Sequence, residues 1–407
     1  MYTIPILLLT SLAAAPLARP PASLPPSQSG RALGGVVFVD RNANGRRDDG
    51  EPGVRDVAVS DQEHVVVTDA QGAYRIPAAG GFGLVFVSVP DGFISRAPFY
   101  RSATGAQPPS AIDFPLVPAP QGATVTFVHA SDTHISDASL ARTQRLRALV
   151  DSIRPAFVLV TGDLVRDALR VGEREATSYY ELFASEAARF DRPLWTVPGN
   201  HEIFGIERDK SGVSADHPLY GRAMYRRYRG PDYYSFNAGG VHFVGLNTVD
   251  IDDTHYYGHV DSLQLAWLTR DLAAIPATMP VITFNHIPFY TAMETVNGYS
   301  DAPPAPSVIT VGGKSDFRHN VSNAAEVLAG LGGRPYPLAL GGHVHAPERL
   351  RFAGVETRFE QAAAVVGAGG RAGLKLPSGV TVYRLTRGRV DEGRFVELGM
   401  NERPESK

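Results

Sequence analysis

The sequence predicts an α/β protein preceded by a small all-β module, and two patterns along the chain indicate this fold class. From about residue 123 onward, short apolar strands alternate with segments of helical period, as in proteins that cover a sheet with helices. Residues 35–116 instead show short strands separated by Asp, Gly and Pro, without a helical period, which is typical of a β-sandwich. At 407 residues the chain is long enough for two domains.

The N-terminus indicates export. Residues 4–15 form an apolar run that ends in three consecutive alanines, with Ala18 close behind, and the run is shorter than the ~20 residues needed to span a bilayer. This pattern is typical of a signal peptide over residues 1–18, so we expect a periplasmic or secreted protein without a transmembrane segment in its mature chain. The alternative is a disordered N-terminal extension. Residues 19–32 are rich in Pro and Ser and predict a flexible linker.

A β-sandwich module with a candidate calcium loop is expected over residues 33–117. Its candidate strands are 36–39, 57–59, 64–67, 74–76 and 84–87. A run with the spacing of a 12-residue calcium loop follows the first strand, and its candidate ligands are Asp40, Asn42, Asn44, Arg46, Asp48 and Glu51. A strand before the loop and Pro52 after it exclude a helix–loop–helix, so the loop resembles those of secreted β-sandwich modules. The alternative is an Asp/Asn/Gly turn without metal.

The larger predicted domain covers residues 123–390, and residues 391–407 are expected as a C-terminal tail. Apolar strands are expected at 126–128, 157–160, 194–197, 281–284 and 338–340, and helices at 139–153, 173–189 and 262–274. Residues 204–233 and 288–321 are expected as long irregular insertions, which in compact domains often form binding walls. The first insertion contains Tyr220, Arg222, Tyr225, Arg226 and Arg227. They indicate either contact with the organic part of a substrate or a solvated surface.

Residues that bind metals follow each of these five strands. In chain order they are Asp132, His134, Asp163, Asn200, His286, His343 and His345. The carboxyl ends of strands in an open α/β sheet are where ligands bind, because the loops converge there. Asp132 and His134 can chelate one ion, His343 and His345 have the same spacing, and Asp163 is the natural bridge between two ions. Such a two-metal site hydrolyses phosphate esters.

The motifs differ in specificity when each is taken alone. A single Asp-x-His or Gly-Asp is as compatible with a turn as with a metal site. Gly199-Asn200-His201-Glu202 after an apolar strand is more specific, because adjacent Asn and His have little structural reason to stand there. The ordered series, each motif after a strand, leaves little room for a purely structural explanation.

This series resembles the calcineurin-like metallophosphoesterase family over roughly residues 124–385. The resemblance implies two packed β-sheets flanked by helices in four layers, and two divalent or mixed-valence metal ions such as Mn, Fe or Zn. It implies that the first ion is held by Asp132, His134, Asp163 and His345. It implies that the second ion is held by Asp163, Asn200, His286 and His343. His201 matches the catalytic histidine of the family that is not a ligand and acts on the phosphate or the leaving group.

Three neighbouring residues are candidates for supporting roles. Glu202 is expected to orient His201 or to brace its loop. Related enzymes often place a carboxylate three residues after the bridging Asp, but here that position is Arg166, and Asp167 follows one step later. Arg166 is either a phosphate contact, which its guanidinium geometry suits, or an exposed ion-pair residue. His129 and His242 lie inside predicted strands and are expected mainly in the core.

Composition narrows the function classes. The chain has no Cys, which excludes disulfides, thiolate catalysis and Cys-type zinc sites. Its net charge of -3 provides no basic surface for nucleic acid, so none is expected as a specific partner. The prediction is an exported two-metal phosphoesterase that hydrolyses a phosphate mono- or diester by attack of a metal-bridging hydroxide. The alternatives are a metal-dependent nuclease on the same site, or a non-catalytic calcium-dependent binding module.

Overall fold

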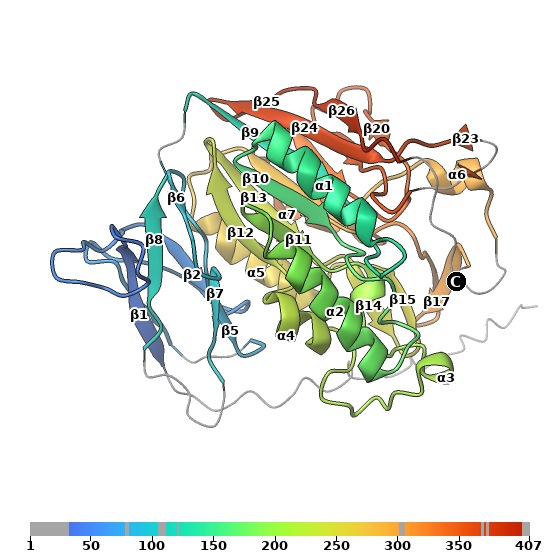
Figure 1. Ribbon diagram of the computed structural model, residues 1–407, viewed down its shortest axis with the longest axis horizontal. Coiled ribbons are helices and arrows are strands. Elements are labelled where there is room, and N and C mark those ends of the chain that lie inside the picture. The colour runs from blue at the N-terminus through green and yellow to red at the C-terminus, as the bar shows by residue number, and fades with distance from the viewer. Residues whose placement is uncertain are drawn as a thin grey trace, which may run out of the picture.

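The computed structural model describes residues 32–77, 81–104, 111–119, 122–300, 306–367, 370–371 and 374–400. The expected signal peptide and, except for residue 32, the expected linker lie outside the described residues. The chain has a strand-rich N-terminal part, blue to cyan in Figure 1, beside a larger part in which helices cover strands. Within the described residues, no helix is long and apolar enough to cross a membrane.

The N-terminal part is a sandwich of two four-stranded sheets, as expected. The first sheet has the order β4 (Ala73–Ile76), β1 (Leu33–Val39), β8 (Phe114–Pro118), β6 (Phe93–Ile94). The second has the order β3 (Val65–Val67), β2 (Ala58–Ser60), β5 (Leu84–Val87), β7 (Tyr100–Ser102). In β4, Tyr74 and Ile76 are buried and Arg75 is exposed, because successive side chains of a strand point to opposite faces. We call this part the N-terminal module.

The larger part contains two six-stranded sheets. The first comprises β11 (Leu194–Val197), β10 (Phe157–Thr161), β9 (Thr124–Ala130), β24 (Gly379–Thr386) and β25 (Arg389–Val390), with β26 (Arg394–Glu397) also paired to β24. The second comprises β12 (Tyr234–Ala238), β13 (Val241–Leu246), β16 (Val281–Asn285), β19 (Leu338–Gly341), β21 (Arg358–Gln361) and β20 (Glu348–Leu350). Residues 391–400, expected as part of a tail, therefore contribute a strand to the first sheet.

The two sheets pack face to face through aromatic rings and carry helices on their outer faces. Phe127 of β9 stacks on Tyr383 of β24, with ring centroids 5.0 Å apart, and meets Phe243 of β13 edge to face at 5.4 Å. The helices α1 (Leu140–Ile153) and α2 (Glu173–Ala187) share a core with β9 and β10 and lie in front of the strands in Figure 1. The helices α5 (Ser262–Ala273) and α7 (Ala324–Gly330) pack against the second sheet. This is the expected four-layer α/β fold.

The expected irregular insertions contain short ordered elements. Residues 204–233 include α3 (Arg208–Ser211) and α4 (Ala223–Arg229). Residues 288–321 include α6 (Met293–Asn297) and a hairpin of β17 (Val308–Val311) and β18 (Lys314–Phe317). A second hairpin, β14 (Val249–Asp252) with β15 (His255–Gly258), precedes α5, and a small pair is formed by β22 (Gly370–Arg371) and β23 (Leu374–Lys375).

The N-terminal module is docked on the larger part by buried contacts. The Trp267 indole N–H of α5 donates to Ser60 Oγ at 3.1 Å, and the Gln62 amide donates to Asp232 Oδ1 at 3.0 Å. Phe86 of the module meets Trp267 edge to face at 6.3 Å. Since apolar burial and paired polar groups both occur here, the interface resembles a protein interior.

Candidate metal centre

Five strands deliver the predicted ligands to one edge of the two sheets. Asp132 follows β9, Asp163 follows β10, Asn200 follows β11, His286 follows β16, and His343 follows β19. The strands β9, β10 and β11 run parallel, as do β13, β16 and β19, so their carboxyl ends meet at a common edge. The loops carrying the predicted ligands therefore converge, as the sequence pattern indicates.

The backbone at the ligands has an unusual conformation. Asp132, His134, Asp163, His343 and His345 have φ of 54°, 39°, 49°, 71° and 56°. Side chains other than Gly rarely adopt this left-handed region, which costs roughly 1 kcal/mol per residue. Each such residue turns the chain sharply at a strand end, so that side chains close in sequence point into one cavity. Residues with strained backbone conformations occur mostly at functional sites.

The first cluster joins Asp132, His134, Asp163 and His345, which are all buried and offer ligand atoms within 4.8 Å of one another. His134 Nε2 lies 3.1 Å from His345 Nε2 and 3.3 Å from Asp163 Oδ2. His345 Nε2 lies 3.2 Å from Asp132 Oδ1. Four donors at such distances surround a space that suits one divalent ion with nitrogen and oxygen ligands.

The second cluster joins Asp163, His286 and His343, and Asn200 completes it. His286 Nε2 lies 3.2 Å from Asp163 Oδ1, 3.1 Å from Asn200 Oδ1 and 3.1 Å from His343 Nδ1. Asp163 therefore presents one carboxylate oxygen to each cluster, which is the geometry of a bridge between two ions. The structure brings together all seven predicted ligands.

Two features show that this set fits metal ions. Asp132 Oδ1 is buried without a hydrogen-bond partner among the described residues, a costly arrangement unless a cation is bound there. Burial and the proximity of His201 lower the pKa of His134 to about 3, and burial with the neighbouring His319 lowers the pKa of His343 well below its usual range. Both imidazoles are therefore neutral and present lone pairs, which is the form that binds metals.

The pKa of His286 is shifted in the opposite direction, upward. Burial acts to lower its pKa, but the carboxylate of Asp163 outweighs burial and raises the pKa to about 9. A proton on Nε2 would occupy the position between Asp163 and Asn200 where a cation fits. The other ring nitrogen, Nδ1, donates to the Thr161 carbonyl at 2.7 Å, which fixes the ring with Nε2 facing the cluster.

His201 stands beside both clusters and belongs to neither. Its Nδ1 donates to the Arg166 carbonyl at 2.6 Å, and its backbone N–H donates to Asp163 Oδ1 at 3.0 Å. With Nδ1 engaged, Nε2 is the atom available to a substrate. It lies 3.9 Å from Asp163 Oδ2, on the wall of a pocket of about 500 Å³ that also exposes both clusters.

Glu202 braces the loop, which was one of its two expected roles. One carboxylate oxygen accepts from the backbone N–H groups of Leu164 and Val165 at 2.8 and 2.9 Å, and the other accepts from Gly199 at 2.6 Å. Burial and the charge of Asp163 raise the pKa of Glu202 to about 8, and the backbone donors oppose that shift. The residue ties the loop after β10 to the loop after β11.

Arg166 and Asp167 contact other residues of the loop and do not line the pocket themselves. Arg166 contributes its carbonyl to His201, and its side chain is not among the residues that line the pocket. Asp167 accepts from the backbone N–H groups of Leu169 and Arg170 and pairs with the Arg170 guanidinium at 3.2 Å. The guanidinium on the pocket wall is therefore that of Arg170, which also pairs with Glu207 at 2.8 Å.

Sequence reasoning missed His319 and Tyr256 together with Arg170. His319 Nδ1 lies 2.6 Å from Nε2 of the ligand His343, and both His319 and Tyr256 line the pocket. Tyr256 in turn packs edge to face on His343, with centroids 6.1 Å apart. His319 comes from the insertion 288–321 and Tyr256 from the hairpin before α5, where no strand-end pattern exists, whereas Arg170 lies far along the loop after β10. The available signal for His319 was one more His in a chain of 12.

The first insertion is a structural element of the fold. Tyr225 is buried, and Arg222 pairs with Asp250 and Asp261 at 2.6 and 2.9 Å. Arg226 pairs with buried Asp232 at 2.9 Å. These side chains hold α4 against β11, β14 and the residues that precede β12 and α5, so neither expected role describes them, whereas Arg227 is exposed on the solvated surface. His129 and His242 are buried in strands, with Thr161 and Asp271 as respective partners, as expected.

The predicted calcium loop folds on itself. Asp40 accepts from the backbone of Asn44 and Gly45, Glu51 accepts from Arg41 and Asp48, and the amides of Asn42 and Asn44 both donate to Asp48. Asp40 and Glu51 are buried, whereas the side chain of Arg46 is exposed. Among the described residues, the acidic and imidazole clusters close enough to hold one ion are the two at the strand ends, and the loop is not one of them.

Comparison with known families decides the identity of the larger part. Residues 125–347 match the family model for calcineurin-like phosphoesterase, which is more than half of the chain. The chain belongs to the calcineurin-like phosphoesterase family. Residues 41–118 match the model for the N-terminal part of calcineurin-like phosphoesterase, so the N-terminal module is a companion of this catalytic domain.

Similar proteins are phosphodiesterases and phosphatases. A probable cyclic nucleotide phosphodiesterase from Rhodococcus erythropolis is 26% identical over 248 residues, or 56% of this chain and 67% of the relative. Purple acid phosphatase 23 from Arabidopsis thaliana is 31% identical over 164 residues, or 39% of this chain and 29% of the relative. A solved dimetal phosphatase from Danio rerio aligns at a TM-score of 0.45 with 16% identity, covering 67% of this chain and 97% of the other. The chain is a metal-dependent phosphoric ester hydrolase with a buried metal-ligand cluster.

Proposed function

We propose that the enzyme is exported and hydrolyses a phosphate mono- or diester at the two clusters that share Asp163. The observation that carries the chemistry is the convergence of Asp163 Oδ2 on His134 and of Oδ1 on His286, beside a pocket lined by His201. Bound there, two divalent ions would supply a nucleophilic water at neutral pH and stabilise charge on the phosphoryl oxygens.

The protein groups divide the remaining work. Asp163, held by the His201 backbone N–H, fixes the spacing of the two clusters. His201 is anchored through Nδ1, and in its protonated form it donates from Nε2 to a phosphoryl oxygen or to the leaving alkoxide. Asp163 and Asp167 lie 3.9 and 4.0 Å from the ring nitrogens of His201, so the ring stands between two carboxylates.

Arg170 provides a second contact for the substrate. Two carboxylates, Asp167 and Glu207, hold its guanidinium on the pocket wall, so little side-chain entropy is lost when a phosphate oxygen binds its remaining N–H groups. Placed on the same pocket as His201, it suits an oxygen of the phosphate that faces away from the clusters.

An assay of metal-reconstituted enzyme tests this function. 4-Nitrophenyl phosphate and bis(4-nitrophenyl) phosphate are compared as substrates, with the metal content of each sample measured. We expect turnover of at least one, a loss of second-cluster metal in Asn200→Ala, and a loss of rate with retained metal in His201→Ala. Two bound ions without turnover of either ester would refute the esterase function, and full activity in Asn200→Ala would refute that ligand.

The proposal of export rests on the apolar run at residues 4–15 and the small residues after it. The mature protein from a host that secretes it should begin after residue 15 or residue 18, which intact-mass measurement reads directly. A protein that retains Met1 and stays in the cytoplasm would refute export.

We also propose calcium binding by the loop Asp40–Glu51, on the basis of its ligand spacing and the buried carboxylates at both ends. Titration calorimetry of the full chain with calcium should give one site of millimolar affinity that is lost in Glu51→Gln. Equal heats from the wild type and Glu51→Gln would leave the loop as an ordinary turn.

A further inference from the structure

A second cavity lies at the opposite ends of the strands that carry the metal ligands. It is open to solvent and has a volume of about 760 Å³. Its lining consists of residues 154–157 and 191–195, where β10 and β11 begin, and residues 93–99 of the N-terminal module. The metal clusters follow the carboxyl ends of the same strands. At ~3.3 Å per residue, the five residues of β10 separate the two sites by roughly 15 Å.

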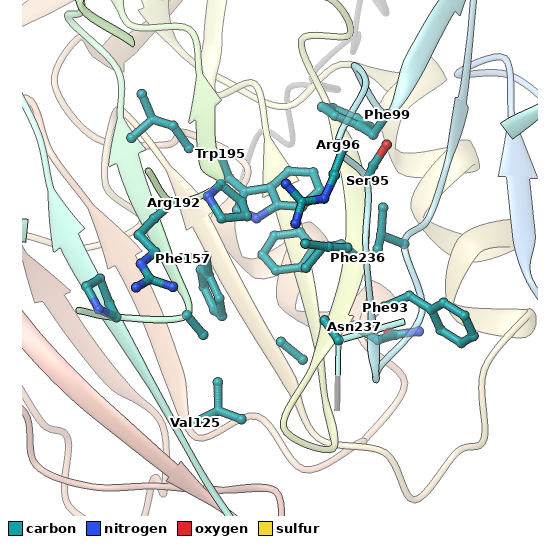
Figure 2. Close-up of a pocket in the computed structure, with 18 of the residues that line it drawn as sticks. Phe93, Ser95, Arg96, Phe99, Val125, Phe157, Arg192, Trp195, Phe236 and Asn237 are labelled. Atoms are coloured by element: carbon teal, nitrogen blue, oxygen red, sulfur yellow. The ribbon is translucent and has the colours of Figure 1, made fainter. Parts of the chain in front are cut away.

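The cavity has an aromatic wall built from both parts of the chain. Trp195 of β11 stacks on Phe236 of β12 with centroids 4.1 Å apart, and Phe99 of the N-terminal module lies 4.8 Å from Trp195. Phe93 and Phe157 also line the space (Figure 2). A volume of this size, at a domain interface and lined by aromatic rings, is typical of a small-molecule site.

Two guanidinium groups approach this wall from different parts of the chain. Arg192 comes from the loop before β11 and Arg96 from the N-terminal module, and both are drawn with the aromatic rings that line the space in Figure 2. Neither makes a hydrogen bond or ion pair with another described residue, whereas Arg170 at the metal pocket is held by two carboxylates. Arg154 also lines the cavity, but it caps α1, where its charge offsets the helix dipole.

The charge of the cavity therefore favours an anion. Its lining contains Arg96, Arg154 and Arg192 against one carboxylate, Asp191. Guanidinium groups bind carboxylate, sulfonate and phosphate oxygens through paired N–H donors, and they also lie favourably over aromatic rings. An apolar ligand would leave both arginines unused, and a small inorganic anion would leave uncovered Phe93 and Phe99, the two rings of the wall that are partly exposed.

We propose that this cavity binds a small planar aromatic compound with one anionic group, held between Arg96 and Arg192 and packed against the ring wall. Because one arginine belongs to the N-terminal module and the other to the catalytic part, such a ligand touches both parts. Binding then stabilises their docking by mass action, since a ligand that binds the docked state alone favours that state. This site is separate from the phosphoesterase reaction and does not depend on it.

Titration calorimetry of the full-length, metal-loaded enzyme tests the proposal with naphthalene-2-sulfonate. This probe has the ring and the charge but no ester to hydrolyse. We expect one saturable site, a dissociation constant at least tenfold weaker in Arg192→Gln and in Arg96→Gln, and unchanged affinity in Arg174→Gln, an exposed arginine on α2. Methanesulfonate, with the same head group and no ring, should not compete.

Two further results separate this site from the metal centre. Asn200→Ala alters the second metal cluster and should leave the affinity for naphthalene-2-sulfonate unchanged, and saturating probe should raise the thermal unfolding midpoint of the wild type but not of Arg192→Gln. Loss of binding in Asn200→Ala would place the probe at the active site. That result, absence of saturable binding, or equal affinity in both cavity arginine variants and the wild type overturns the proposal.

Discussion

At the scale of single residues, the metal centre depends on side chains whose effect passes through a neighbour. His201 is oriented by the carbonyl of Arg166, Glu202 binds three backbone N–H groups, and His343 is held by His319. Partners that orient a ligand ring fix its tautomer and its direction. The reactive geometry is therefore determined by more residues than those that would touch a metal ion or substrate.

Arg170 should matter for substrate and not for metal. Replacing it with Gln removes a charge from the pocket while leaving both clusters intact, so we expect kcat/KM for 4-nitrophenyl phosphate to fall about 10- to 100-fold, which is roughly 1.4 to 2.7 kcal/mol. Metal content should stay at the wild-type value. Arg174→Gln on the exposed face of α2 is the matched control, and equal losses in both variants would remove Arg170 from the site.

His319 should matter for metal affinity. Without its contact to His343 Nε2, the ligand ring can rotate, and loss of such a partner typically weakens metal binding 10- to 100-fold. We expect His319→Ala to lose metal from the second cluster first in a chelator titration, and His319→Asn, which keeps a polar partner, to recover part of the affinity. A chelator midpoint in His319→Ala equal to that of the wild type would contradict this role.

Some residues of the site can be predicted from the sequence and others cannot. The convergence of the seven predicted ligands and His201 could be predicted because each follows an apolar strand, and strands can be recognised by local pattern. Tyr256 and His319 were not, because their place on the pocket depends on how loops return from elsewhere in the chain. Arg170 was not, because it lies well beyond the end of β10, where the strand no longer indicates which way a side chain points. Arg166 illustrates the opposite error. Its guanidinium suggested a phosphate contact, but in the structure its carbonyl accepts a hydrogen bond from His201.

At the scale of elements, the loops at the strand ends are packed too tightly for ordinary side chains. A Cβ on Gly199 would collide with the backbone and carboxylate of Asp163, and a Cβ on Gly162 would collide with the His286 ring. The glycines before Asp163 and Asn200 thus allow two loops from neighbouring strands to touch. This close contact explains why a Gly precedes both Asp163 and Asn200. The sequence shows the two glycines but not the contact that requires them.

Gly199→Ala should therefore damage the centre while sparing the fold. The added methyl group must displace Asp163, the residue shared by both clusters, so we expect loss of bound metal and a rate at least 100-fold below wild type. Far-ultraviolet circular dichroism should be unchanged, since the loop lies beyond the strands. Gly172→Ala, before α2, is the matched control because Gly172 has negative φ like Gly199 and room for a methyl group. Retained metal in Gly199→Ala would refute the packing argument.

At the scale of the whole molecule, one buried carboxylate links the N-terminal module to the catalytic part. Asp232 accepts from Arg226 in α4, from Gln62 of the module and from Asn247 after β13. Burial opposes its ionisation, but Arg226 outweighs burial and lowers the pKa of Asp232 to about 2. The ionised group thus holds together three segments far apart in the sequence.

Asp232→Asn should cost stability in a pH-dependent way. Because the folded pKa is depressed, the ionised carboxylate stabilises the fold above its unfolded pKa of about 4, and this contribution disappears as the pH falls toward 2. We expect the variant to lose about 2 kcal/mol or more at pH 7 by urea unfolding, with a smaller difference from wild type at pH 3. Exposed Asp216→Asn should be neutral, and an equal deficit at both pH values would exclude the charge as the cause.

The order of strands in the first sheet has a consequence for how the protein is made. β9 pairs with β24, whose residues are translated some 250 positions later, and His343 and His345 are also late in the chain. A ribosome-bound nascent chain that ends before residue 379 therefore exposes one edge of β9, the strand that leads to Asp132. Neither cluster can be complete before its late ligand, His343 or His345, has been translated, and the sheet that carries Asp132 gains its second partner strand for β9 only when β24 follows.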